Sequence, residues 1–407
     1  MTDQENRNQL HLHVAGMDRP GILADVLGEI VEHECLVVDI KQFVFNGLLN
    51  LSLLVESRDN EKLTSLNQTL LEANRIRDCQ VRATPWDREL RPEEPYCFRQ
   101  VVTLLGRRLG SVAMAELTAT LASLDLNILR IEQLDYSDHH VLEFVIGSQK
   151  PMAGVEVLDA LVSFKEQFEV DLAVQEDSPF RRNKRLIVMD ADMTFLQCEV
   201  IDELGKVAGC GEQLGEITRA AMNGDVDFAE ALKRRVALLK GLTVDQLNEV
   251  SRRIPLTPGA EALVGILKKL GYKIAIVSGG FRFFIDRFKE TYGLDYGFAN
   301  ELEIVGGKVT GNLVGDIVDA QAKRDILLSL ANREGLAVEQ VVAVGDGAND
   351  IQMLAGAGLG IAFNAKPIVA KHARASLTTA NLEPILYFLG IPGKEIEELR
   401  QMSRKVG

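Results

Sequence analysis

The sequence predicts an α/β protein in which a C-terminal domain with a parallel sheet follows two smaller α+β modules. From Leu186 onward, short apolar runs (LIVMD, KIAIVS, VVAVGD and GLGIAF) alternate with helical stretches, as is typical of parallel strands covered on both faces. Before Leu186, two segments repeat one order of strands and helices. LADVLGEIVEHECLVVDI aligns without gaps to MAELTATLASLDLNILRI, with apolar positions matched.

Composition narrows the classes of function. The 407 residues are 46% hydrophobic and 26% charged, as in a soluble globular protein, with a net charge of −14. An acidic chain is a poor partner for nucleic acid, because phosphate backbones require a basic face. No apolar run approaches the roughly 18 residues of a membrane span. The polar N-terminus lacks an apolar signal region, and the five scattered cysteines form no CxxC pair, so we expect a cytoplasmic protein with reduced thiols.

Two charged, proline-bearing stretches, 84–95 and 176–185, are predicted to be linkers. They divide the chain into residues 1–84, residues 97–175 and residues 186–407. Within the last part, residues from about 199 to 253 interrupt the alternation of strands and helices and have a helical pattern. We therefore expect a helical cap inserted after the first strand of the C-terminal domain.

The first module begins with the strand LHLHVAG and the turn GMDRPG, followed by a helix over residues 22–34. LVVDIKQFVF and LLNLSLLVE alternate as strands, and Asn46-Gly47 between them predicts a tight hairpin turn. The second module repeats this pattern from FRQVVTLLG onward. Both modules are therefore predicted to have the order βαββαβ.

This order, with a glycine-rich turn before the first helix, resembles the ACT domain of amino-acid metabolism. GMDRPG, from Gly16 to Gly21, matches the turn of that family, whereas the second turn, GRRLG from Gly106, lacks the proline and the acidic residue. The resemblance implies an amino-acid regulator near Gly16, Asp18 and Gly106, and assembly into a homodimer. A simple turn before a helix also explains GMDRPG, since Pro20 suits an early helix position.

In the C-terminal domain, polar residues follow three predicted strands. Ligands of open α/β sheets bind at the carboxyl ends of the strands, so these residues are expected to meet there. Lys323 lies at the start of a helix between the second and third of these strands. The strand-end residues are Asp190, Asp192 and Thr194, then Ser278 and Gly279, then Asp346, Asn349 and Asp350.

Several clustered carboxylates repel one another unless a cation neutralises them. Oxygen ligands without His or Cys select a hard ion, and Mg²⁺ with a substrate phosphate fits this set. An Asp carboxylate can attack phosphorus to form an aspartyl-phosphate, and a second carboxylate can transfer protons. Lys323 and the Ser278 hydroxyl can contact the phosphoryl group.

DADMT, Ser278, Lys323 and GDGAND, in this order, resemble the four motifs of the haloacid dehalogenase superfamily. The resemblance implies a Rossmann-like core in which Asp190 is the nucleophile and Asp192 the general acid and base. It also implies Mg²⁺ bound by Asp190, Asp192 and Asp346, with Asp350 supporting the metal site.

Glu199, VSGGF and MNGDVDFAEALKRRVALLKGL resemble the phosphoserine phosphatase family within this superfamily. The substrate implied is O-phospho-L-serine, with L-serine as the expected regulator. In this family a cap glutamate binds the substrate ammonium and a cap arginine binds its carboxylate, and the matching positions are Glu199 and Arg235. The other implied substrate contacts are Met222, Phe228, Gly279 and Asn349.

Met193 departs from the family pattern, which has Ser after the second Asp. Because the superfamily varies at this position and Thr194 is kept, we expect activity to survive, and a change of rate or substrate preference stays open. Two alternatives remain open on the sequence: a phosphatase of another small phosphomonoester, and an amino-acid-sensing regulatory protein with a silent phosphatase core.

Overall fold

The computed structural model describes residues 8–72, 76–86, 96–137, 139–222 and 225–404. The chain forms two compact units, Met1–Pro95 and Tyr96–Gly407. In the described ranges, no helix has both the length and the apolar character needed to cross a bilayer.

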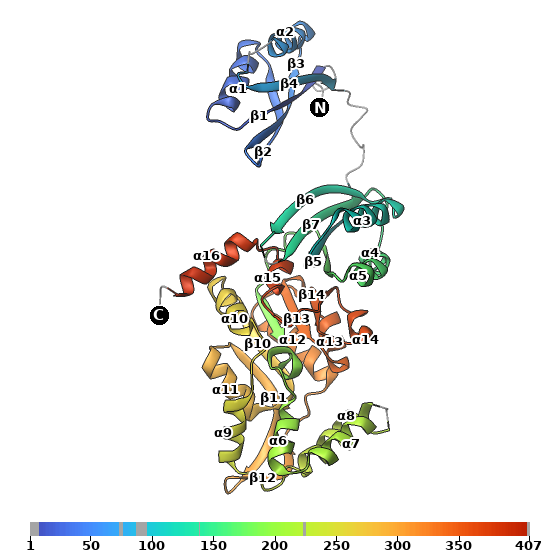
Figure 1. Ribbon diagram of the computed structural model, residues 1–407, viewed down its shortest axis with the longest axis vertical. Coiled ribbons are helices and arrows are strands. Elements are labelled where there is room, and N and C mark those ends of the chain that lie inside the picture. The colour runs from blue at the N-terminus through green and yellow to red at the C-terminus, as the bar shows by residue number, and fades with distance from the viewer. Residues whose placement is uncertain (1–7, 73–75, 87–95, 138, 223–224, 405–407) are drawn as a thin grey trace. The chain divides into compact units, whose positions relative to one another are not determined.

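The first unit is a four-stranded antiparallel sheet with two helices and a core between them (Figure 1). Its strand order is β2-β3-β1-β4, and the order along the chain is the predicted βαββαβ. The elements are β1 (Asn8–Met17), α1 (Ile22–Glu32), β2 (Leu36–Phe45), β3 (Leu48–Ser57), α2 (Asn60–Leu71) and β4 (Cys79–Trp86).

Alternation of apolar residues along β1 explains this packing. Leu10, Leu12 and Val14 are buried in the core of the unit, while the residues between them are less buried. Asn46 and Gly47 both have positive φ and join β2 to β3, as a two-residue hairpin turn requires. The predicted hairpin is therefore confirmed.

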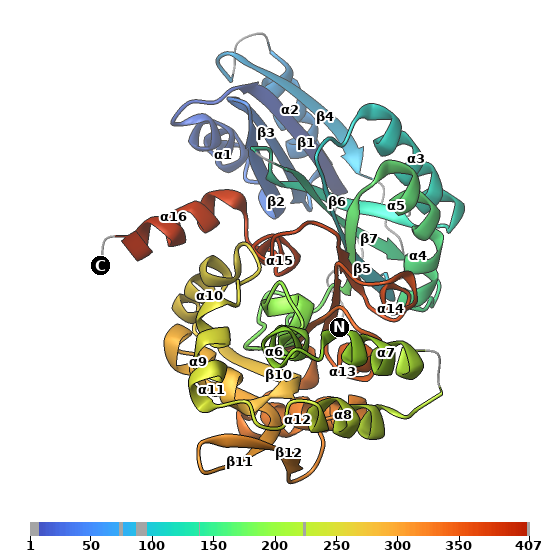
Figure 2. The same cartoon turned by 60° about the horizontal axis from the view of Figure 1, so that its bottom comes forward.

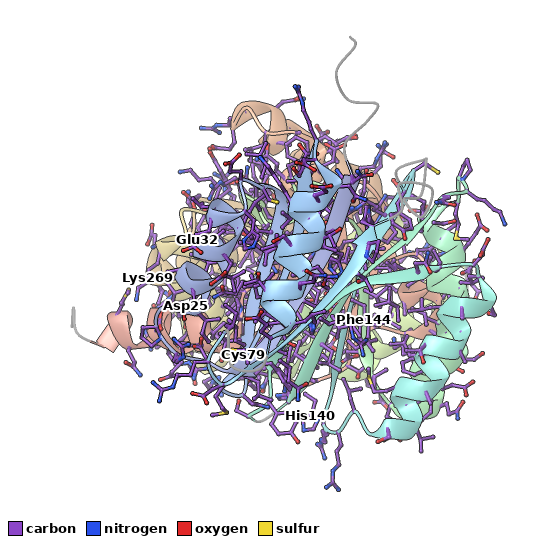
Figure 3. All side chains as sticks on the ribbon, turned by 90° about the horizontal axis from the view of Figure 1, so that it is seen from above. Asp25, Glu32, Cys79, His140, Phe144 and Lys269 are labelled. Atoms are coloured by element: carbon purple, nitrogen blue, oxygen red, sulfur yellow. The ribbon has the colours of Figure 1, made fainter. Side chains whose placement is uncertain are left out.

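The second unit begins with a module of the same element order, in which the second helix is divided in two at Leu161. Phe144 on β7 is fully buried in the core of this module (Figure 3). The elements are β5 (Phe98–Gly106), α3 (Ser111–Ser123), β6 (Asn127–Asp135), β7 (His140–Ser148), α4 (Gly154–Ala160), α5 (Val162–Phe168) and β8 (Asp171–Glu176).

The C-terminal core that follows has strands covered by helices on both faces (Figures 1 and 2). Its strands are β9 (Leu186–Met189), β10 (Lys273–Phe281), β11 (Tyr296–Val305), β12 (Lys308–Val314), β13 (Val341–Gly345), β14 (Leu359–Phe363) and β15 (Ala375–Leu377). Its helices are α10 (Ala260–Lys269), α11 (Arg282–Tyr292), α12 (Ala320–Arg333), α13 (Ile351–Ala355), α14 (Pro367–Ala370), α15 (Ile385–Phe388) and α16 (Gly393–Arg404). Between β9 and α10 lie the cap helices α6 (Val200–Ala208), α7 (Gly211–Met222), α8 (Phe228–Ala237) and α9 (Val244–Arg253).

The continuous apolar run of β9 explains why both faces are covered. Ile187 and Met189 enter the hydrophobic cluster on one face, and Leu186 and Val188 enter the cluster on the other. All four are completely buried. A strand buried on both sides cannot alternate apolar with polar residues, which is the pattern observed in the sequence.

The core sheet extends into the preceding module. The order is β12-β11-β10-β9-β13-β14-β15-β8-β5-β7-β6, and β15 pairs antiparallel with β8 through Ala375 opposite Ala173 and Ser376 opposite Leu172. The structure thus has two compact units where the linkers predicted three parts. The physical reason is that β8 covers the edge that β15 would otherwise expose.

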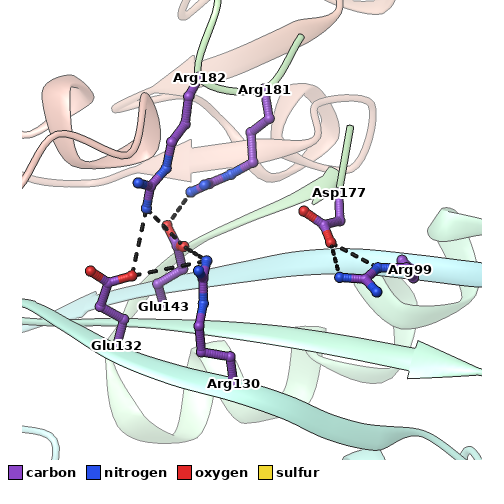
Figure 4. Close-up of polar contacts among 7 residues, drawn as sticks. All are labelled: Arg99, Arg130, Glu132, Glu143, Asp177, Arg181 and Arg182. Atoms are coloured by element: carbon purple, nitrogen blue, oxygen red, sulfur yellow. Dashed lines mark hydrogen bonds and ion pairs between the residues drawn. The ribbon is translucent and has the colours of Figure 1, made fainter. Parts of the chain in front are cut away.

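A buried ion cluster also joins this module to the segment that leads into β9. Glu143 on β7 is completely buried and pairs with Arg181, Arg182 and Arg130 (Figure 4). Arg181 is itself buried, and burial lowers its pKa despite the nearby Glu143 carboxylate. Removing one member would leave a buried charge without its partner, so the cluster holds the module against the core.

Candidate active site

Three strands of the core meet at one level, where β9 and β13 end and β10 continues to Phe281. Met189, the last residue of β9, lies opposite Ile276 on β10 and Val344 on β13. Because β9 runs between β10 and β13, its next residue emerges at the centre of this edge. The residues that meet there are those predicted from the strand ends: Asp190, Ser278 and Asp346.

A tight turn over Ala191–Phe195 follows Asp190. Met193 in this turn has φ of 56°, a left-handed conformation that is uncommon for a residue with a side chain. The Thr257 hydroxyl donates to the Thr194 carbonyl at 2.7 Å, and the Thr194 hydroxyl donates to Asp346 Oδ1 at 3.0 Å. These bonds fix the turn to the end of β13.

Lys323 on α12 is completely buried beneath the strand ends. Its Nζ donates to Asp190 Oδ1 at 2.6 Å and to Asp350 Oδ1 at 2.7 Å. Burial opposes the ammonium charge, but the two carboxylates outweigh burial and raise the pKa of Lys323. Asp350 also accepts from the Gly347 N–H at 3.0 Å, so both of its oxygens are engaged.

Asp192 faces the cap side of the site. Its Oδ1 accepts from the Val200 N–H at 2.8 Å, and its Oδ2 accepts from the Ser278 hydroxyl at 3.3 Å. Burial raises the pKa of Asp192 despite these bonds. A carboxyl held in this way can carry a proton and release it, as a general acid and base must.

The structure contains an acidic cluster suited to a cation. Asp190, Asp346 and Asp350 each offer a carboxylate oxygen, and these oxygens lie within 4.8 Å of one another. Burial and the charge of Asp350 raise the pKa of Asp346 to about 6 and that of Asp190 well above its usual range. Such raised values indicate an excess of negative charge, and the oxygen ligands suit a hard divalent ion.

A cavity of about 100 Å³ opens above these groups. Its cap side carries Glu199, at the start of α6, and Arg235 on α8. Burial and the neighbouring carboxylates, Asp192 first, raise the pKa of Glu199 to about 7, although its side chain keeps contact with solvent at the mouth. The lining is Asp190, Asp192, Glu199, Ile201, Phe228, Leu232, Arg235, Gly279, Gly280, Phe281, Asp346, Gly347 and Asn349.

Arg235 differs from its neighbour Arg234. Arg234 is exposed and pairs with Glu230 one helical turn earlier. Arg235 is half-buried, its Nε is buried without an acceptor, and in the described ranges its guanidinium forms no ion pair. A desolvated guanidinium that lines a cavity is suited to a ligand carboxylate.

Comparison with known proteins identifies the family. A phosphoserine phosphatase of Streptomyces coelicolor is 38% identical over 401 residues, covering 98% of this chain and 96% of that protein. The chain belongs to the phosphoserine phosphatase family. A phosphoserine phosphatase of Mycobacterium tuberculosis is 38% identical over 391 residues, covering 94% of this chain and 93% of that protein.

Two segments of the chain match the models of two different protein families. Residues 184–358 match the haloacid dehalogenase-like hydrolase family, and residues 8–84 match the ACT domain. A solved structure described as a probable phosphoserine phosphatase from Vibrio cholerae, unliganded, is 34% identical, with a TM-score of 0.56. The match covers 74% of this chain and 88% of that chain. The chain is therefore a phosphatase of the phosphoserine phosphatase family that uses a metal ion and acts on a small molecule.

The structure places the predicted site residues that it describes at two depths. Ser278, Lys323 and Asp350 are buried beneath the cavity, at most 1% exposed. The side chain of Met222, at the end of α7, lies outside the described part of the chain. The predicted residues that line the cavity are Asp190, Asp192, Glu199, Phe228, Arg235, Gly279, Asp346 and Asn349.

Met193 is exposed and is absent from the described lining of the cavity. Gly16, Asp18 and Gly106 are also absent from it. Their role as regulatory residues stays a prediction.

The predicted regulatory turn is tightly built. A side chain at Gly16 would lie 2.4 Å from the Asp78 carbonyl and 2.8 Å from Cys79 Sγ, so only glycine fits. Arg19 pairs with Asp25 at 3.0 Å on the neighbouring helix (Figure 3 labels Asp25 and Cys79). These contacts fix the conformation of the turn. Binding of an amino acid at this turn stays a prediction.

Sequence reasoning missed several residues of the cavity lining. Phe228, Leu232 and Arg235 follow one another at helical spacing on α8, so the assignment of Phe228 and Arg235 could have indicated Leu232. Gly280 and Phe281 directly follow Ser278 and Gly279 on β10, so this run could have indicated them, whereas no comparable pattern marks Ile201 and Gly347. The missed residues are Ile201, Leu232, Gly280, Phe281 and Gly347.

Proposed function

We propose that the chain hydrolyses O-phospho-L-serine to L-serine and phosphate through a phospho-aspartate on Asp190. The observation that supports this proposal most directly is the arrangement of charged groups around the cavity. Asp190 lies at its base with Lys323 beneath it, and Glu199 and Arg235, whose guanidinium has no ion pair among the described residues, lie on its cap side. Phosphoserine has the complementary groups, with a phosphate at one end and an ammonium and a carboxylate at the other.

The chemistry begins with attack by an Asp190 oxygen on phosphorus. The ester bond from phosphorus to the serine oxygen breaks, and Asp192 donates a proton to that oxygen. Water then attacks phosphorus while Asp192 takes its proton, and the Asp190 carboxylate leaves as phosphate is released. Lys323, hydrogen-bonded to Asp190, holds the nucleophile in one orientation.

Mg²⁺ is the metal we propose. Asp190 and Asp346 would hold it, with Asp350 close by, because these carboxylates are hard oxygen donors in one cluster. The ion would neutralise negative charge on the phosphate when bound. The Asp192 carboxylate, which faces Val200 and Ser278, fits the proton-transfer role better than that of a ligand.

A panel of four substrates tests the assignment. Phosphoethanolamine lacks the carboxylate of phosphoserine, 3-phosphoglycerate lacks its ammonium, and p-nitrophenyl phosphate lacks both. We expect the highest kcat/KM for phosphoserine. A higher kcat/KM for any other member would favour a different phosphomonoester, and no turnover of any member would favour a silent core.

We also infer that the first unit mediates homodimerisation and binds an amino acid, with L-serine as the expected ligand. β2 is an edge strand, and all ten of its residues are exposed. Val38, Phe43 and Phe45 are among its exposed apolar side chains. An exposed apolar edge strand favours pairing with another chain.

We propose a cytoplasmic location, and the five free cysteines are compatible with it.

Truncation at the boundary between the two compact units tests this role. Deleting residues 1–95 should preserve turnover and remove both the dimer and any effect of L-serine other than competition. A truncated enzyme that keeps the dimer and the serine response would contradict it. Deleting residues 1–180 is a poor substitute, because it removes β8 from beside β15 and Glu143 from Arg181.

A further inference from the structure

A second cavity, of about 260 Å³, lies between the module of residues 98–176 and the catalytic core. Helices α4 and α5 and strand β8 form one wall, and the segment around α14 and β15 forms the other. Its apolar lining includes Leu158, Val162 and Leu172 from the module and Pro367, Ala370 and Ala373 from the core. Cavities at the junction of two parts of a fold are common ligand sites.

Of the polar side chains in this lining, Lys165 and Ser376 are the two that are not exposed. Lys165 on α5 is half-buried, and its ammonium forms no hydrogen bond or ion pair with any residue of the described ranges. Burial lowers its pKa, although Asp171 favours the charged form. Ser376 on β15 is 7% exposed, and its hydroxyl also bonds to no described residue.

We propose that this cavity binds a small organic acid with an apolar tail, with its carboxylate on Lys165 and Ser376. The Lys165 ammonium is half-buried and has no hydrogen-bond acceptor among the described residues, and a ligand carboxylate would provide one. The hydroxyl can donate a second hydrogen bond, and the apolar walls suit a short branched hydrocarbon chain. The cavity volume of about 260 Å³ is below the range of sites for drug-sized ligands, so a small molecule is the expected occupant.

This site goes beyond the proposed phosphatase activity and shares no lining residue with the phosphatase cavity. Its rim has both charges, since Asp159, Glu166 and Lys371 are exposed there. An α-amino group on the ligand can therefore be accommodated near the rim. A bound ligand would contact both the module and the core, and would stabilise their packing.

Calorimetric titration of the full chain with three probes of equal tail tests the proposal. The probes are 4-methylpentanoate, L-leucine and 4-methylpentan-1-amine. We expect the acid to bind and the amine not to bind. Binding of leucine would support the same site, provided that it is lost in the Lys165→Met variant. Failure of the acid to bind at concentrations up to about 10 mM, or equal binding of the amine, would overturn the proposal.

Single substitutions test whether the acid binds in this cavity. Lys165→Met keeps the aliphatic stem and removes the charge, and should weaken binding of the acid by about tenfold or more. Lys150→Met, at an exposed lysine of the same module, should not change it. Arg235→Ala should not change it either, which separates this site from the phosphatase cavity. Unchanged affinity in Lys165→Met would contradict the assignment.

A second variant tests the same cavity and leaves the charge of Lys165 in place. Ala370→Phe places a ring in the cavity and should prevent binding while leaving phosphoserine turnover unchanged. Thermal melts of both variants show whether they fold. Full binding by a folded Ala370→Phe variant would mean that the ligand binds elsewhere.

Discussion

Lys323 Nζ lies 2.6 Å from Asp190 Oδ1, and the same ammonium lies 2.7 Å from Asp350 Oδ1. One buried cation thus connects the proposed nucleophile after β9 to the turn after β13. Two carboxylates in this position would repel each other without it. Burial and the charge of Asp350 raise the pKa of Asp190, whereas the Lys323 ammonium lowers it and so favours the ionised form that attack on phosphorus requires.

Replacing Lys323 with Met should therefore affect both stability and rate. Removing one partner of a buried ion pair typically costs about 3–5 kcal/mol of unfolding free energy. We expect a destabilised protein in which the fraction that still folds has lost most of its turnover. Denaturant unfolding and kcat at a temperature where the variant is folded measure the two effects. Lys206→Met, at an exposed cap lysine, serves as the control and should change neither.

Arg235→Ala should reduce activity on phosphoserine selectively. Losing a desolvated charge partner costs about 2–5 kcal/mol, which is roughly 30-fold to several thousand-fold in kcat/KM. Phosphoethanolamine has no carboxylate and should lose much less. The adjacent Arg234→Ala is a matched control, because Arg234 is exposed and pairs with Glu230. Equal losses on both substrates would mean that Arg235 supports the fold or the phosphate site.

Metal removal should abolish turnover reversibly. We expect EDTA to stop the reaction, Mg²⁺ to restore it and excess Ca²⁺ to inhibit, because Ca²⁺ adopts longer and looser coordination. Binding of Mn²⁺ followed by electron paramagnetic resonance gives a readout independent of rate, and Asp346→Asn should weaken it. Full activity after exhaustive chelation would exclude the metal from the scheme.

Lys184 provides a prediction for the dependence of stability on pH. Burial, with Arg374 and Arg181 nearby, lowers its pKa to about 8. The folded state therefore binds fewer protons than the unfolded state above pH 8, and unfolding free energy should rise with pH up to about 10.5. The gain from this residue is about 3 kcal/mol.

Denaturant unfolding of Lys184→Met from pH 7 to 10 checks this gain. The variant lacks the titrating group, so its stability relative to the parent should fall as the pH rises. Lys394→Met, at an exposed lysine, should follow the parent. A stability difference between Lys184→Met and the parent that stays constant across this range would contradict the assigned pKa.

The sequence predicted the position of a site residue wherever that position depends on a single strand or a single turn. Asp190 and Asp346 follow apolar runs that can only be buried strands, so their meeting at one sheet edge was predictable. The pairing of β15 with β8 was not, because β15 has three residues and no periodic pattern. Ile201 was also missed, since its place in the cavity depends on how the cap packs against the core.

The central claim is that phosphate is transferred to Asp190, and chemical trapping tests it directly. Borohydride reduces an aspartyl-phosphate to homoserine, so enzyme quenched during turnover of phosphoserine and then reduced should contain homoserine at position 190. Mass spectrometry of the peptide that contains residue 190 makes the measurement, and Asp190→Asn, which should lack turnover, is the control. Homoserine at Asp192 or Asp346 instead, or turnover by Asp190→Asn near that of the parent, would contradict the account.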